Sequence, residues 1–218
     1  MNFGGCMAKT AILIGNGIFD SSIKDYRNYV DEFIDFANRN RMDRVIVSGG
    51  HTDTNSMHSE ASSLNNYMKP RLDKRIKLVT EEKSITASQS IKYIKPILRL
   101  KPHDDVTVFC DSAIAVKVMW FVMHYWFSMS KKEIEGDALN FISAHYSRRN
   151  GIDDMGKWIS VTGVLYKNVE VHPYIIKPSL PSAIAQQLIS IIDIASIYNP
   201  ALYKDFISAT KQRYGLKK

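Results

Sequence analysis

The chain has 218 residues, of which 45% are hydrophobic and 23% are charged, and its formal net charge is +7. This is the composition of a globular protein, which excludes extended disorder and fibrous or low-complexity structure. No apolar run reaches the roughly 18 residues that span a bilayer, and the first ten residues lack the pattern of a signal peptide, so we expect a cytoplasmic protein without a membrane span.

Short β-branched runs alternate with helical patterns along the first two thirds of the chain. The predicted strands are residues 10–14, 44–47, 76–80, 106–110 and 139–144. The predicted helices between them are residues 26–38, 59–68, 86–100 and 113–127. This alternation predicts an α/β fold of the Rossmann-like type, a three-layer sandwich with a mainly parallel five-stranded sheet and helices on both faces.

The pattern changes after about residue 145, so we divide the chain into a Rossmann-like domain, 1–145, and an extension, 146–218, packed on the same domain. In the extension we expect a loop, two further strands and two helices separated by the Asn199-Pro200 break. The aromatic-rich stretch 119–127 contains Trp120 and Trp126. A helix this apolar should be covered by the C-terminal elements or by a second copy in a homodimer.

Polar and glycine residues follow the predicted strands at the edge where open parallel sheets bind ligands. In chain order they are Gly15, Asn16 and Gly17, then Ser48, Gly49, Gly50 and His51, then Glu81 and Glu82, and finally Asp111 and Ser112. Glycine turns let a phosphate, ribose or carboxylate approach the backbone, and we expect the Gly49 and Gly50 amides to hold an anion. The chain has neither a dinucleotide-binding G-x-G-x-x-G nor a G-x-x-x-x-G-K-[ST] phosphate loop.

Candidate catalytic groups lie close to these turns. Glu60 and Glu82 are candidate acids or bases, and His51 is the best-placed histidine for a general base. Several of the candidate site residues have a purely structural alternative role. Ser59 and Glu60 can simply begin a helix, Asp111 can cap one, and a loop histidine such as His51 is usually solvated. The two cysteines and the scattered histidines have no metal-ligand spacing, so we expect reduced thiols and no metal site.

Several of these residues occur in an order that resembles a known family. Arg27, then the sequence IVSGG at 46–50, then Ser59-Glu60-Ala61, then Glu82, Ser84 and Thr86 are similar to the YdcF/SanA/ElyC-like family of domains of unknown function. The similarity covers roughly residues 10–127. It implies a Rossmann-like domain that binds a small nucleotide-like or anionic ligand, with S-adenosylmethionine binding proposed in one branch and cell-envelope roles in others.

The resemblance adds residues to the expected site and also departs from the family pattern. It places Arg27, Thr86 and Gln89 at the ligand, with Gln89 where the family has an asparagine. Ala115 stands in place of the family histidine and cannot transfer a proton. Lys117, close by in sequence, is the candidate replacement for the missing positive charge.

Three functions remain open. The first is a protein that binds a small ligand without catalysis, and the second is an enzyme that transfers or hydrolyses a group on a nucleotide-like substrate. The third is a nucleic-acid-binding protein, because of the net charge of +7. The Lys and Arg residues are spread over 69–77, 148–149 and 211–218 without an aromatic stacking pattern, which favours a solvated basic face over nucleic-acid binding.

Overall fold

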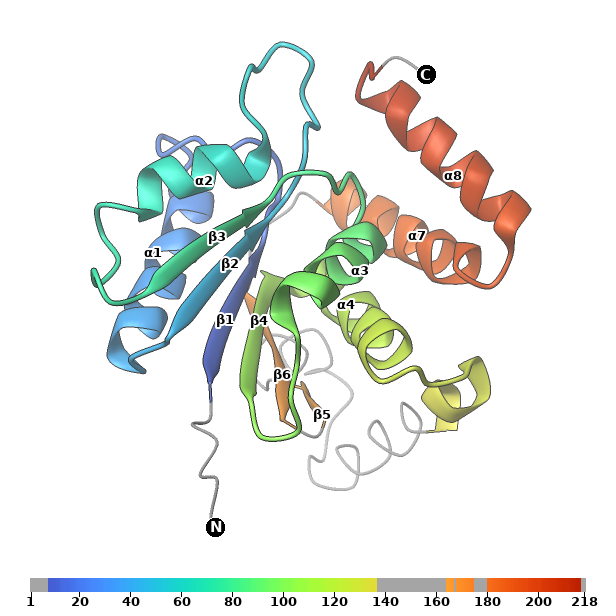
Figure 1. The fold of residues 1–218 in the computed structure, drawn as a ribbon. Helices are drawn as coiled ribbons and strands as arrows, with labels where there is room; N and C mark the ends of the chain where they lie inside the picture. Colours follow the sequence, from blue (N-terminus) through green and yellow to red (C-terminus); the bar gives the residue numbers. More distant parts are fainter. Residues whose placement is uncertain (1–7, 137–163, 167, 175–179, 217–218) are drawn as a thin grey trace.

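Strands from distant parts of the chain form one sheet in the computed structural model, which describes residues 8–136, 164–166, 168–174 and 180–216. In this part of the chain the sheet has six strands in the order β3-β2-β1-β4-β6-β5 (Figure 1). They are β1 (Lys9–Ile14), β2 (Arg44–Ser48), β3 (Lys77–Glu81), β4 (Asp105–Asp111), β5 (Val164–Tyr166) and β6 (Val169–Tyr174). All neighbours pair in parallel except β5, which runs antiparallel to β6 at one edge.

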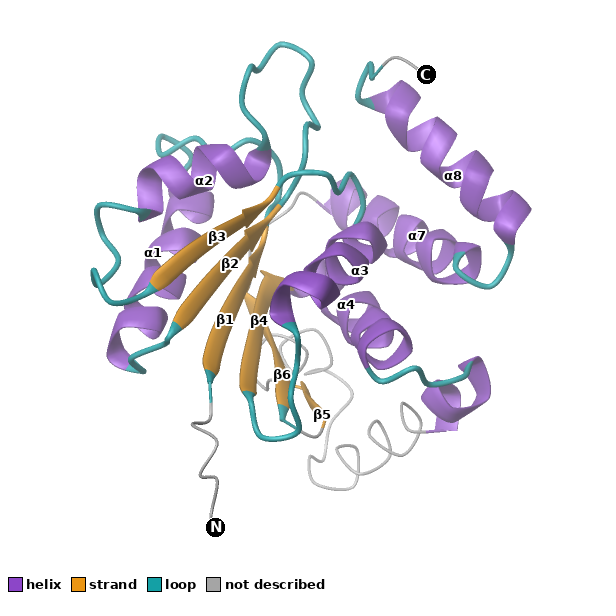
Figure 2. Ribbon diagram, in the orientation of Figure 1, coloured by secondary structure: helices purple, strands orange, loops and turns teal. Residues whose placement is uncertain are grey.

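Helices cover both faces of the sheet (Figure 2). They are α1 (Lys24–Arg39), α2 (Glu60–Met68), α3 (Ala87–Leu98), the short η1 (Ser112–Ile114), α4 (Ala115–Phe121) with a π-helical turn η2 (Val122–Trp126), α7 (Leu180–Ser196) and α8 (Pro200–Arg213). Successive residues of β1 alternate between two hydrophobic clusters: Leu13 packs with α1 and α2, and Ile12 packs with α3 and α4. Burial on both faces explains the nearly continuous apolar strands.

The predicted α/β fold with a mainly parallel sheet is therefore confirmed. The predicted strand 139–144 lies outside the described residues, and the fifth parallel strand is β6, from the region we assigned to the extension. Val171 of β6 is paired with Val108 of β4, so the extension contributes a strand to the sheet as well as packing on it. None of the described helices is long and apolar enough to cross a membrane.

The aromatic stretch that begins in α4 is covered by other parts of the same chain. Trp126 is 8% exposed, and its indole N–H donates to the Ile91 carbonyl of α3 at 2.8 Å. The indole N–H of Trp120 donates to the Tyr198 hydroxyl, between α7 and α8, at 2.9 Å. The C-terminal elements thus help to cover this helix, as expected, and a homodimer through it stays a prediction.

A buried ion pair joins α7 to α4. The Nζ atom of Lys117 lies 3.5 Å from Oδ2 of Asp193, and the two side chains are 8% and 1% exposed. Burial raises the pKa of Asp193, and the positive charge of Lys117 opposes this effect. The side chain of Ser88 also interacts with the Asp193 carboxylate and lowers its pKa. Each charge is therefore stabilised mainly by the other.

Removing one partner of this ion pair should destabilise the protein more than replacing both partners with apolar residues. We expect Asp193→Asn to lower the free energy of unfolding by about 3 kcal/mol, because it leaves the Lys117 charge buried and unpaired. The double variant Lys117→Met, Asp193→Leu should lie within about 1 kcal/mol of the original protein. Urea unfolding measures both.

The exposed ion pair of Lys131 and Glu135 supplies the control, since removing it should cost less than about 0.5 kcal/mol. An Asp193→Asn variant as stable as this control would show that the buried pair does not hold α7 in place.

Candidate functional site

A cavity of about 430 Å³ lies at the carboxyl end of the sheet, where the strand ends meet α3, α7 and α8. Small-molecule sites commonly have this size and this position in open α/β sheets. Its lining consists of Ile14, Gly15, Asn16, Gly17, Ser48, Gly49, Thr52, Glu60, Ser84, Ile85, Thr86, Ala87, Ser90, Ile114, Lys117, Ile189, Asp193, Phe206, Ala209, Thr210, Arg213 and Tyr214. Eight of the expected site residues are among them: Gly15, Asn16, Gly17, Ser48, Gly49, Glu60, Thr86 and Lys117.

Glu60 is the acidic residue at the centre of the strand-end wall. It is the first residue of α2, whose start is capped by the Ser59 hydroxyl, which accepts from the Ser62 N–H at 2.9 Å. The N–H groups of Glu60 and Ala61 donate to the carbonyls of Gly50 and Gly49 at 3.0 and 2.9 Å. These bonds fasten the helix start to the end of β2. The side chain of Glu60 is consequently turned inward and is only 7% exposed.

The glycines of the strand ends make room for this side chain. A Cβ atom on Gly15 would lie 2.5 Å from Oε2 of Glu60, and one on Gly49 would lie 2.6 Å from both Cβ and Oε2 of Glu60. Gly50 is constrained differently, because a Cβ there would lie 2.3 Å from the backbone oxygen of Ser84. The glycine turns therefore serve the packing of the site itself, and a larger residue at Gly50 would push two backbone segments apart.

The expectation that the glycine amides hold an anion is wrong. The N–H of Gly49 donates to the Glu81 carbonyl at 3.0 Å, and the N–H of Gly50 donates to the Ser84 carbonyl at 2.7 Å. The N–H of Gly15 likewise donates to the Ser48 carbonyl at 2.8 Å. Because these three donors already bind backbone oxygens, they are not available to an anion in the cavity.

The environment of Glu60 changes its acidity. Burial raises the pKa of Glu60 to about 7, although the Thr52 hydroxyl and the Gly17 N–H both donate to the carboxylate and favour its charged form. Tyr26 supports this loop, since its hydroxyl donates to the Gly17 carbonyl at 3.0 Å and accepts from the Asn16 N–H at 3.0 Å. A carboxyl group with this pKa is present in both protonation states at neutral pH, which is typical of functional sites.

A second buried acid, Glu81, lies at the end of β3 and is 4% exposed. Its Oε2 accepts from the Ser48 hydroxyl at 2.7 Å, and its Oε1 accepts from the Lys83 and Ser84 N–H groups at 2.7 and 3.1 Å. The Ser90 hydroxyl donates to Oγ of Ser84 at 3.0 Å. Glu81 therefore holds in place the hydroxyl groups that line this side of the cavity.

Glu82, the acid we expected at this position, is exposed instead and does not line the cavity. Its carboxylate accepts from the Ser59 hydroxyl at 2.8 Å and so supports the start of α2. Side chains alternate between the two faces of β3, and this alternation distinguishes Glu81 from Glu82. Glu81 lies two residues after Val79, which packs against the α3 side of the sheet, so Glu81 faces the same way.

Other expected residues lie near the cavity without lining it. Asp111 caps the next turn through a 3.0 Å bond from the Ala113 N–H, and its Oδ2 lies 3.5 Å from Nδ2 of Asn16. Burial raises the pKa of Asp111, whereas the Ala113 N–H and the Ser112 hydroxyl lower it. Gln89 accepts from the Ile85 N–H at 2.9 Å and approaches the Tyr203 hydroxyl of α8 at 3.4 Å.

Two expected residues lie on the surface. The side chain of His51 is exposed and does not line the cavity, so the structure gives it no partner as a general base among the described residues. Arg27 is exposed as well, and its guanidinium donates to the Ser21 carbonyl at 3.4 Å instead of reaching Glu60 or Glu82. We also find no group of three or more His, Cys, Asp or Glu side chains arranged to hold a metal within the described residues.

The far wall of the cavity comes from helices that the sequence did not connect with the site. Asp193 of α7 lies beside Lys117, and α8 contributes Phe206 and Arg213, followed directly by Tyr214. No residue of α8 is buried, so this helix covers the cavity without being part of the core. A contact between distant segments leaves no local pattern, and for this reason none of these residues except Lys117 was expected.

The raised pKa of Glu60 predicts a specific pH dependence of stability. Its folded-state pKa of about 7 lies above the ordinary value of 4.5, so the folded protein binds the proton more tightly than the unfolded chain. This stabilising contribution is complete below about pH 4.5 and is lost as the pH rises through about 7. The stability of the original protein relative to Glu60→Gln should therefore fall by about 2 to 3 kcal/mol between pH 5 and pH 8.

Urea unfolding at several pH values measures this difference, and taking it against the variant cancels the other titrating groups. The exposed Glu32 provides the control, because Glu32→Gln should leave the pH dependence of stability unchanged. A parallel pH dependence in the original protein and Glu60→Gln would mean that Glu60 titrates as an ordinary exposed acid.

No protein-family model matches this chain, and no curated protein sequence matches it. The resemblance described above therefore stays an expectation. The function of the site has to be inferred from the geometry and chemistry of its residues.

Proposed function

We propose that the protein binds a small nucleotide-like ligand in the cavity at the carboxyl end of the sheet. The observation that carries this proposal is the position of Glu60, a buried acid with a pKa of about 7 that lines a cavity of about 430 Å³. Burial of an ionisable side chain lowers the stability of the folded protein. Residues with perturbed pKa values are concentrated at functional sites.

The chemistry of the walls supports this ligand class. A nucleotide-like molecule has a flat apolar base, hydroxyl groups and a charged end. Ile85, Ile114 and Phe206 offer apolar surface to a base, while hydroxyl groups of the Ser48–Ser84–Ser90 network and the Glu60 carboxyl are partners for a ribose. Lys117 and Arg213 are the cationic residues of the lining. Because the charge of Lys117 is paired with Asp193, Arg213 is the partner for an anionic group. S-adenosylmethionine, which the family resemblance suggests, belongs to this class.

An enzyme that transfers or hydrolyses a group on such a ligand is the second candidate. It is favoured by the same pKa, because an acid that titrates near pH 7 can donate and accept a proton under physiological conditions. Glu60 would be the acid or base in this case. Arg213 and Tyr214 line the same cavity and would bind the developing charge.

Binding can be tested with a panel of adenine nucleotides and S-adenosylmethionine, using isothermal titration calorimetry. We expect Arg213→Gln to weaken binding of an anionic member by about 1 to 3 kcal/mol, the usual loss for a charged hydrogen bond. Lys204→Gln is the matched control, since Lys204 is an exposed cation of α8 outside the cavity lining. Equal effects of the two substitutions, or no binding of any panel member, would contradict the proposal.

The two candidates differ in what Glu60→Gln does to a bound ligand. If the protein is an enzyme, we expect this variant to retain binding but to lose roughly two to four powers of ten in turnover, with a pH profile that breaks near 7 in the original protein. If the protein only binds, no product should form, and the variant should change only the affinity and its pH dependence. Mass spectrometry of the incubated ligand distinguishes these outcomes.

A further inference from the structure

The positive charge of the protein is concentrated at the end of the sheet opposite the cavity. Residues 38–44 and 69–77 contain eight Lys and Arg residues and only two Asp residues, whereas the whole chain has 29 basic and 22 acidic residues. These two segments therefore hold most of the net charge of +7, and the rest of the chain is nearly neutral. They lie at the amino ends of β2 and β3, and the cavity lies at the carboxyl ends.

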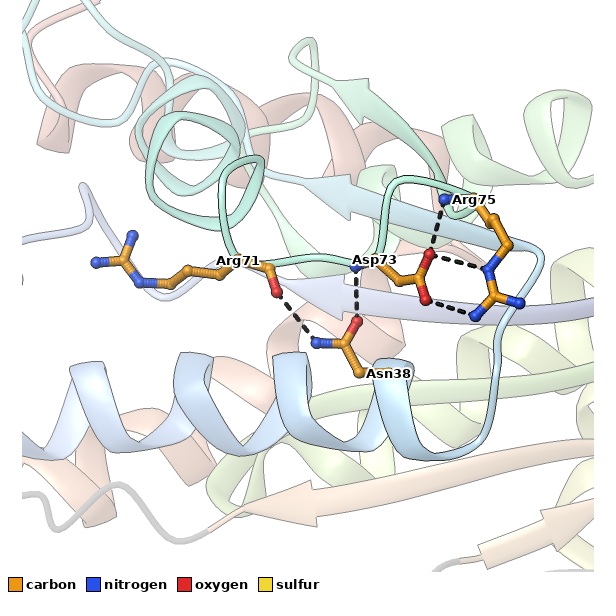
Figure 3. A network of polar contacts seen from close by, with 4 residues as sticks. All are labelled: Asn38, Arg71, Asp73 and Arg75. Carbon is orange, nitrogen blue, oxygen red and sulfur yellow. Dashed lines mark hydrogen bonds and ion pairs between the residues drawn. The ribbon is translucent and has the colours of Figure 1, made fainter.

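The fold brings the two segments together through Asn38, in the last turn of α1 (Figure 3). Its Nδ2 donates to the Arg71 carbonyl at 3.1 Å, and its Oδ1 accepts from the Asp73 N–H at 2.9 Å. The N–H of Lys77 donates to the Asp43 carbonyl at 3.0 Å. The loop between α2 and β3 is thus held against the end of α1, and the basic residues of both segments are presented by a fixed backbone.

Two of the eight basic residues are set apart, because one is paired with an acid and the other is only partly exposed. Arg75 is paired with Asp73 at 2.6 Å, and Arg44 donates to the carbonyls of Ile97 and Leu98 at the end of α3. The remaining six are exposed, and we call them the basic end: Arg39, Arg41, Lys69, Arg71, Lys74 and Lys77. Within this set, Arg39 and Arg71 also donate to backbone carbonyls, those of Asp35 and Tyr67. This surface combines the basic cluster 69–77 with basic residues of 38–44, a segment that we did not single out from the sequence.

We propose that the basic end binds the phosphate backbone of a nucleic-acid duplex without reading its bases. Six exposed cations on a fixed backbone match a partner with closely spaced phosphates, because each neutralised phosphate releases counterions. The apolar residues of these segments, Met42, Leu72 and Ile76, are buried, so this surface has no side chain to insert into a lipid bilayer. This partner is independent of the ligand proposed for the cavity.

Tyr67, at the end of α2, already contacts a cation of the basic end. The guanidinium of Arg71 lies 3.8 Å from the centre of the Tyr67 ring. Segments 38–44 and 69–77 contain no aromatic residue themselves. Since sequence-tolerant binding of single strands depends on aromatic rings that stack on bases, the surface favours a duplex over an unpaired strand.

The test is fluorescence anisotropy with a labelled duplex of about 20 base pairs, titrated at several salt concentrations. With about four phosphate contacts, the logarithm of the association constant should fall with the logarithm of salt concentration with a slope of about −3.6. The triple variant Lys69→Gln, Lys74→Gln, Lys77→Gln should bind at least about tenfold more weakly and reduce the slope by about 2 to 3.

The matched control removes the same charge from exposed lysines elsewhere, as Lys92→Gln, Lys132→Gln, Lys204→Gln. It should change the affinity by less than about twofold. Equal losses in both triple variants would overturn the proposal, because net charge and not this surface would then explain binding. Failure to bind the duplex, together with binding of vesicles that contain phosphatidylserine, would overturn it in favour of a membrane partner. Circular dichroism confirms that each variant is folded.

Discussion

The burial of the Glu60 carboxyl group is the constraint on which the rest of the site depends. Space for this side chain requires glycine at Gly15 and Gly49, where any Cβ atom would collide with it. Its inward position requires the start of α2 to be fastened to the end of β2 by backbone hydrogen bonds. Because burial removes water from the carboxyl group without supplying a cation as a direct partner, its pKa rises to about 7. The glycines at the strand ends, the attachment of the start of α2 and the raised pKa of Glu60 therefore depend on one another.

The C-terminal helices form one wall of the cavity, opposite the strand ends. The start of α2 supplies Glu60, and the end of β2, the loop after β3 and α3 supply the serine hydroxyls. The helices α7 and α8 supply Asp193, Arg213 and the apolar Phe206. These two helices differ in how they are held. α7 is joined to α4 by the buried pair of Lys117 and Asp193, whereas α8 has no buried residue. Elements with little buried surface open at low free-energy cost, so α8 is the wall of the cavity that can move most easily.

The two ends of the parallel sheet have different chemistry. At the carboxyl end, the Gly15, Gly49 and Gly50 amides bind backbone oxygens, and polar side chains line a cavity. At the amino end, Asn38 of α1 joins the end of this helix to the loop between α2 and β3, and basic residues outnumber acidic ones in both segments. A parallel sheet separates these ends by the length of its strands, so a small ligand at one end leaves the other surface open to a large partner.

The sequence by itself determined the α/β fold, the succession of the first four strands and helices along the chain, and the start of a helix at Ser59-Glu60. Strand runs, helix periodicity and caps are local signals, so they can be recognised without the tertiary structure. Only the tertiary structure decided that the Gly49 and Gly50 amides are occupied, that Glu81 and not Glu82 is buried, and that Arg27 and His51 lie on the surface. It also decided that Asp193 joins Lys117 and that two basic segments meet at Asn38. These features depend on contacts between residues far apart in the chain, and such contacts leave no periodic or neighbouring pattern in a single sequence.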